Sequence, residues 1–386
     1  MSAQADACRK AMKGLGTDEA ALIRVLAHLS PLEVPALKQA FQQRHGRSLE
    51  HDVEKEVSGH FEMCLLSILR GPLQNDVWSL HKAIHGAGTK EHLLDEVLIG
   101  RSNADMKAIK QAYQDTYHRP LEHDVRGDLS AKTQRMYEMI LSATRQEESA
   151  PVLPQSVDAD VTELYRATEA KIGTEQLTVC AILTNRSNGQ IRAIAQAYEQ
   201  KYRRPLEKIL ISEFAGHMEQ ALVQMVRCGA DRTMRDAIAL EDCMAGAGTK
   251  DDLLVHRVVK IHWNPYHVHQ VKAAYRQRYG HDLIHRIKGE TRYVNSRTLL
   301  LNASIIIHKS CLMSKKAACL LINYLFWNRI VSIEKLILII VVVAIMNDVW
   351  LRCSRRHRQE RLGLVIGATE LRWHNGTAAF AMLILN

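Results

Sequence analysis

The chain has 386 residues, enough for one large domain or several ordinary ones, and 47% of them are hydrophobic, which allows a sizeable core. Its formal net charge is +9, but the excess is confined to residues 293–386, where 12 Lys and Arg face 4 Asp and Glu, whereas residues 1–292 are almost neutral. A neutral body without a basic stripe attracts polyanions weakly, so we expect no nucleic-acid partner.

The N-terminal segment and the cysteines indicate a cellular compartment. Residues 1–10 are polar and lack the apolar core of a signal peptide. The eight cysteines are scattered, and none belongs to a Cys-x-x-Cys pair. We therefore expect reduced thiols in a cytoplasmic protein.

Four segments of the chain resemble one another in the same order. Each contains a short motif that ends in an aromatic residue, at Phe41, Tyr113, Tyr198 and Tyr275, and these positions lie 72, 85 and 77 residues apart. Each motif is followed by a similar stretch, which begins at Arg47, Arg119, Arg204 or His281. Such repetition indicates one structural unit used four times. We interpret the recurring aromatic residues as core packing.

Hydrophobic residues within a repeat follow helical spacing. One face of a helix is formed by Leu22, Ile23, Leu26 and Leu29, and another by Leu93, Leu94, Val97 and Leu98. Residues 1–292 lack the alternation typical of strands. A repeat of roughly 70 residues holds about five short helices, so we predict an all-α fold. We place the repeats at 1–72, 73–145, 158–229 and 230–292, with a linker at 146–157 and a tail at 293–386.

Each repeat contains a glycine loop that ends in a threonine, at Thr17, Thr89, Thr174 or Thr249. A Gly-x-Gly turn lets several carbonyl oxygens point outward together. Calcium binds six to eight oxygens, and a carboxylate among them supplies charge. A single loop of this kind is explained equally well as a capped helix entry. In the third loop, Lys171 stands where the other loops have their first glycine.

An acidic residue follows each loop at a nearly constant distance. Glu56, Asp128 and Glu213 lie 40 residues after the second glycine of their loops. In the fourth repeat that position is Lys288 and the nearest acid is Glu290, which a two-residue insertion at 261–266 would bring into register. This recurrence favours four calcium sites over four ordinary turns. One carboxylate leaves each ion short of oxygens, so an anionic headgroup should strengthen binding.

These motifs resemble those of the annexin family. The resemblance rests on residues 13–19, the Arg-Ser-Asn triplets at 101–103 and 186–188, and residues 124–128, and it covers about residues 3–291. It implies four repeats of five helices in a curved disc that attaches peripherally to acidic phospholipid membranes when calcium rises. Self-assembly on the bilayer stays open. The implied ligands are main-chain oxygens of Met12, Gly14, Gly16, Ile84, Gly86, Gly88, Lys171, Gly173, Met244, Gly246 and Gly248, with the carboxylates of Glu56, Asp128, Glu213 and Glu290.

Both ends of the chain depart from the family pattern. The sequence starts almost inside the first helix, so no regulatory N-terminal head is expected. From Tyr293 onward it matches no repeat. Residues 336–346 form an apolar run of 11 residues, short of the ~20 that span a bilayer. The tail is either a variant end that packs poorly, which we favour, or a membrane helix.

Two other functions remain as alternatives. Helical repeats often serve as calcium-independent scaffolds for protein partners. A glycine turn before a helix can also bind phosphate in an enzyme, although these loops lack the Gly-Lys-Ser/Thr ending of a P-loop. The histidines of the fourth repeat do not have the spacing of zinc ligands. We expect no enzymatic activity.

Overall fold

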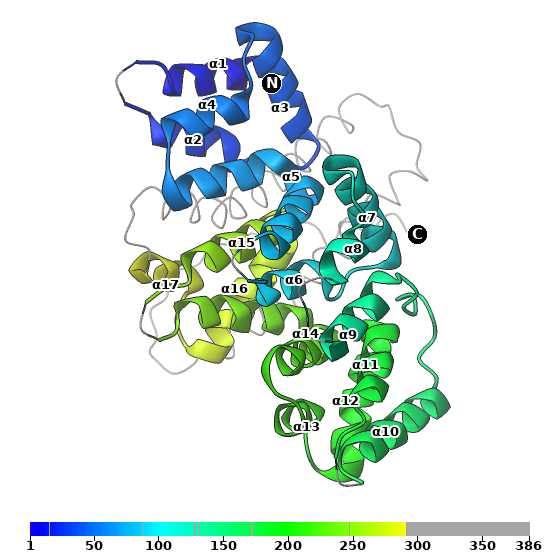
Figure 1. Cartoon of the computed structure of the whole chain (residues 1–386). Coiled ribbons are helices and arrows are strands. Elements are labelled where there is room, and N and C mark those ends of the chain that lie inside the picture. Colours follow the sequence, from blue (N-terminus) through cyan, green and yellow to red (C-terminus); the bar gives the residue numbers. More distant parts are fainter. Residues whose placement is uncertain are drawn as a thin grey trace, which may run out of the picture. The chain divides into compact units, whose positions relative to one another are not determined.

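The computed structural model describes residues 1–14, 16–86, 88–126, 129, 131–170, 173–246 and 248–290. These residues belong to one compact unit, 1–311, and the second unit, 312–386, lies outside the described residues. The described part of the chain contains helices and no strand (Figure 1). The prediction of an all-α fold is therefore confirmed.

Seventeen helices are found in this described part. In chain order they are α1 Ser2–Ala11, α2 Glu19–Leu26, α3 Glu33–His45, α4 Leu49–Glu56, α5 Gly59–Ile84, α6 Glu91–Leu98, α7 Asn103–Tyr117, α8 Leu121–Arg126, α9 Ala131–Leu141, α10 Pro154–Thr168, α11 Gln176–Asn185, α12 Asn188–Tyr202, α13 Leu206–Glu213, α14 Gly216–Met244, α15 Asp251–His262, α16 Pro265–Tyr279 and α17 Leu283–Glu290.

The two longest helices are each interrupted by a residue with non-helical geometry. In α5 this residue is Gly71, with φ +73°, followed by Pro72. A left-handed glycine is tolerated there, and proline has no N–H to continue the helical hydrogen bonds. In α14 the break is at Asp231. Each long helix is thus two consecutive helices, one ending a repeat and the other beginning the next.

In the part of the chain that the structure describes, the buried hydrophobic side chains form two clusters. One extends from Val77 to Cys228 and joins the second and third repeats. The other combines residues 5–69 with residues 237–287, so the first repeat packs against the fourth. In Figure 1, α15 of the fourth repeat lies against α5.

The recurring aromatic residues lie in these clusters. Phe41, Tyr113, Tyr198 and Tyr275 are fully buried, which confirms that they are core residues. The described helices include none that is both long and apolar enough to cross a bilayer. The apolar run at 336–346 lies outside the described residues.

Candidate functional site

The four glycine loops are closed by the same kind of hydrogen bond. In three loops a backbone N–H donates to the carbonyl seven positions earlier: Asp18 to Ala11 at 2.8 Å, Lys90 to Ala83 at 2.9 Å, and Lys250 to Cys243 at 2.8 Å. In the third loop Glu175 donates to Ala167 at 2.8 Å, eight positions earlier. The third loop is therefore one residue longer than the others. It thus differs from them in length as well as in lacking the first glycine.

The second glycine of every loop adopts a left-handed backbone. The φ angles are +82° at Gly16, +79° at Gly88, +85° at Gly173 and +96° at Gly248. Other residues are strained in this region, so the turn requires glycine.

The first glycine position is less uniform. Gly14 has φ +118° and Gly246 has φ +100°, whereas the φ of Gly86 lies outside the left-handed range. The second loop therefore needs glycine at one position where the first and fourth need it at two. Lys171 lies outside the described residues.

In the three repeats whose acid the structure describes, the acidic residue reaches its own loop. The hydroxyl of Thr17 donates to the Glu56 carboxylate at 3.3 Å and to its main-chain oxygen at 3.2 Å. The same contact joins Thr174 to Glu213 at 2.7 Å and Thr249 to Glu290 at 3.0 Å. Asp128 lies outside the described residues. Glycine turn and distant acid are therefore neighbours in space, as the sequence spacing predicts.

Repeat four keeps this contact despite its different spacing. Thr249 and Glu290 are 41 positions apart, against 39 for Thr17 and Glu56. The difference equals the two-residue insertion inferred from the sequence. Glu290, not Lys288, is therefore the residue that meets the fourth loop.

A buried aspartate anchors the short helix that carries the acid. Asp52 of α4 is 2% exposed and accepts hydrogen bonds from Arg9 at 3.2 Å and from Arg47 at 2.8 Å. Its hydrogen bond with Arg47 lowers the pKa of the Asp52 carboxyl, which stays ionised. Because Glu56 ends the same helix, anchoring Asp52 also positions Glu56.

The donor set of these loops suits a hard cation. Each loop can offer main-chain oxygens, and in the first, third and fourth repeats one carboxylate lies beside the loop, which matches the oxygen preference of Ca²⁺. Within the described ranges, no three His, Cys, Asp or Glu side chains form a metal cluster. The sequence predicts that main-chain oxygens supply most of the ligands. The ligand roles themselves stay a prediction.

Histidines of the fourth repeat bind protein groups. His267 contacts the Asp236 carboxylate at 2.6 Å. His281 contacts the main-chain oxygen of Tyr279 at 2.7 Å and the Tyr275 hydroxyl at 3.3 Å. These contacts give the two rings structural partners.

A buried ion cluster that the repeat spacing does not predict connects the second and fourth repeats. Glu96 is 1% exposed and pairs with Arg257 at 2.9 Å, Arg235 at 3.2 Å and Lys260 at 3.2 Å. Burial opposes its charge, but the three cations outweigh burial and hold the pKa of Glu96 well below its ordinary value. The signal in the sequence is the presence of Arg257 and Lys260 in the otherwise mostly apolar α15.

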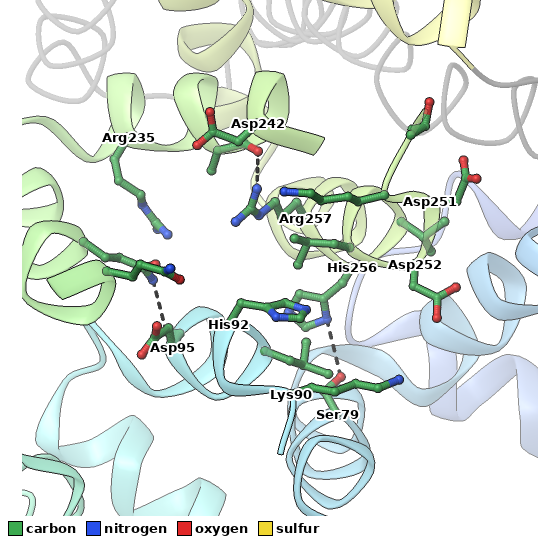
Figure 2. Close-up of a pocket in the computed structure, with 18 of the residues that line it drawn as sticks. Ser79, Lys90, His92, Asp95, Arg235, Asp242, Asp251, Asp252, His256 and Arg257 are labelled. Atoms are coloured by element: carbon green, nitrogen blue, oxygen red, sulfur yellow. Dashed lines mark hydrogen bonds between the residues drawn. The ribbon is translucent and has the colours of Figure 1, made fainter. Parts of the chain in front are cut away.

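A pocket of about 940 Å³ lies beside this cluster. Figure 2 shows Arg235, Arg257, His92 and His256 directed toward it, with Asp95 at its edge. Burial is the main cause that lowers the pKa of His256 to about 3, so this histidine is neutral, and its Nδ1 lies 3.4 Å from the Ser79 hydroxyl.

Comparison with known proteins places the four repeats in a family. The annexin family model matches residues 3–68, 75–140, 159–225 and 235–300. The fourth match extends to residue 300, beyond the end of the resemblance at about residue 291, so the prediction that no residue from Tyr293 onward matches a repeat is wrong for residues 293–300.

Curated relatives are similar over most of the described chain. Annexin C1 of Cryptococcus neoformans is 42% identical over 290 residues, which cover 74% of this chain and 62% of that protein. Human annexin A7 is 36% identical over 296 residues, covering 77% of this chain and 60% of the relative. The chain thus spans about three fifths of the length of these relatives.

Solved annexin structures have a similar fold. The structure of a mutant of annexin A8 superposes with a TM-score of 0.74 at 29% identity, and the match covers 78% of this chain and 94% of that one. The structure of chicken annexin V superposes with a TM-score of 0.72 at 31% identity, and the match covers 78% of this chain and 95% of that one.

Proposed function

Because the chain belongs to the annexin family, we propose that it binds acidic phospholipid membranes in a calcium-dependent manner through its glycine loops. The observation that carries the proposal is the contact between loop threonine and distant acid in three repeats. Annexins are generally not enzymes, and we propose a non-enzymatic role for this chain as well.

The proposed ligands are those implied by the sequence. Main-chain oxygens of the first loop would bind one ion together with Glu56, those of the second with Asp128, those of the third with Glu213, and those of the fourth with Glu290. Calcium supplies positive charge between these oxygens and the headgroup. The chain itself would position the ligands. Glycines with a left-handed backbone would orient the carbonyl oxygens, and the helices that carry the acids would hold the carboxylates in place.

We propose that calcium binding and membrane binding are coupled. One carboxylate and a few neutral carbonyls do not complete the six to eight oxygens that calcium binds, so phosphoryl oxygens of lipids would fill the remaining positions. Several weak sites on one protein then add through multivalency. We propose that the protein is cytoplasmic and attaches to the membrane peripherally when calcium rises.

Vesicle co-sedimentation tests the proposal. The full chain should pellet with phosphatidylserine-containing vesicles in calcium and stay in solution with EDTA or with pure phosphatidylcholine. Calcium-independent pelleting with the vesicles would contradict the proposed calcium dependence. Calcium-independent capture of a protein partner without vesicle binding would favour the scaffold alternative.

A further inference from the structure

A guanidinium lies among the oxygens predicted to bind calcium in the fourth loop. Arg286 of α17 donates from Nη2 to the main-chain oxygen of Met244 at 2.6 Å and from Nη1 to the Glu290 carboxylate. Both acceptors belong to the ligand set of that loop. A cation of the protein itself therefore bridges the carbonyl side and the acid side of the site.

Glu241 holds this guanidinium in place from α14. Its carboxylate accepts hydrogen bonds from Nε of Arg286 at 3.4 Å and from Nη2 at 3.3 Å. The Tyr275 hydroxyl also donates to Glu241. A guanidinium stays charged in proteins, and Glu241 and Glu290 hold that of Arg286 in one place. Arg286 is therefore a fixed positive charge beside the loop.

The equivalent position in the other repeats carries no cation. Four residues before the acid, the first repeat has Asp52 and the second has Asp124. Asp52 binds Arg9 and Arg47, and Asp124 binds Arg119 at 2.9 Å. The third repeat has the buried Ile209. In the fourth repeat the charge at this position is reversed.

We propose that Arg286 is an internal counter-ion of the fourth loop, which calcium must displace from Met244 and Glu290 before it can bind. This inference rests on the proposed function, because it concerns the affinity of one of the proposed sites. A carboxylate oxygen and a carbonyl oxygen engaged by a guanidinium are not free for Ca²⁺, and the two cations repel each other at contact distance. The fourth site therefore fills after the others as calcium rises.

Equilibrium dialysis of calcium against the full chain, without lipid, tests the proposal. Replacing Arg286 with methionine, R286M, should make calcium binding at the fourth site tighter on the order of tenfold, since the competing charge is removed while an unbranched side chain remains. Adding Glu290→Gln to this variant should abolish the gain. In the wild type, Glu290→Gln alone should leave the calcium curve unchanged at concentrations that fill the other sites.

Two further variants keep the test decisive. Arg286→Gln removes the charge but keeps an amide that can bond Glu241, so it replaces R286M if that variant does not fold. Arg44→Met is the matched control, since it also removes a guanidinium paired with a carboxylate, that of Asp6. It should leave calcium binding unchanged.

The outcomes separate this inference from the proposed function. Unchanged binding in both Arg286 variants, or a gain that survives Glu290→Gln, would overturn the role of Arg286. Failure of the wild type to bind calcium would instead contradict the proposed function. Even then, tighter calcium binding in the Arg286 variants that requires Glu290 would support the inference about Arg286.

Discussion

The hydroxyl of Thr17 donates a hydrogen bond to the carboxylate of Glu56, 39 positions later in the chain, at 3.3 Å. The contact joins the loop before α2 to the end of α4. It places an acidic side chain at the glycine turn through contacts within the protein. The proposed calcium site would thus be preorganised, and we expect its calcium affinity to depend on both the loop backbone and the acid.

The first glycine of a loop should matter in the first repeat and not in the second. Gly14 has φ +118°, whereas the φ of Gly86 lies outside the left-handed range and its nearest neighbours would be 3.8 Å from an added Cβ. Gly14→Ala should therefore lower the free energy of unfolding by about 1–2 kcal/mol and raise the calcium needed for vesicle binding. Urea unfolding and co-sedimentation measure the two effects. Gly86→Ala is the matched control, and equal losses in both variants would contradict this reading of the loops.

The Glu96 carboxylate should contribute strongly to the free energy of unfolding. Glu96→Gln leaves Arg235, Arg257 and Lys260 without their shared anion in a buried position, which should cost about 3–5 kcal/mol of unfolding free energy. Urea denaturation measures the loss. Asp158→Asn, which breaks the exposed pair with Lys201, should cost less than about 1 kcal/mol. A loss at Glu96 no larger than that of the control would show that the cluster does not stabilise the fold.

His256 should make the protein less stable in mild acid. Its pKa is lowered to about 3 in the fold, against roughly 6.5 when unfolded. Because the unfolded chain binds the proton more readily, stability falls as the pH drops from about 6.5 toward about 3, by about 2 kcal/mol at pH 5. His256→Asn retains a polar group near Ser79 and should remove this part of the pH dependence. Unfolding curves of the wild type and the variant at pH 7 and pH 5 measure this effect. If both proteins lose the same free energy of unfolding between pH 7 and pH 5, His256 is not the cause of the pH dependence.

The repeat architecture and the pairing of loops with acids could be predicted because both are local or periodic in the sequence. The glycines and threonines of the loops recur in one order, and the distance from Gly16 to Glu56 returns at Gly173 and Glu213. Even the shift to Glu290 follows from counting an insertion. Because each repeat folds alike, two residues at a fixed spacing within the repeat occupy the same relative positions in every copy.

Contacts between distant repeats could not be predicted in this way. Glu96 meets Arg257 across 161 positions, and the spacing of a repeat gives no information about which faces of two repeats meet. The extra residue of the third loop appears only when the bond from Glu175 to Ala167 is seen. The position of the Arg286 side chain depends on Glu241, which lies on another helix. The contact of Arg286 with the fourth loop could therefore not be predicted from the sequence either.

We propose that the acids 40 residues after the second glycine of the first three loops, and Glu290 in the fourth repeat, bind calcium at the membrane. A calcium titration of binding to phosphatidylserine vesicles, with Glu56→Gln and Asp128→Asn combined, tests it most directly. Glu54→Gln serves as the control, because Glu54 lies on the same helix, α4, and is exposed there. We predict that the calcium midpoint of the double variant rises at least about tenfold, since two sites lose their charged ligand, while that of the control stays at the wild-type value. An unchanged midpoint in a folded double variant would contradict the claim.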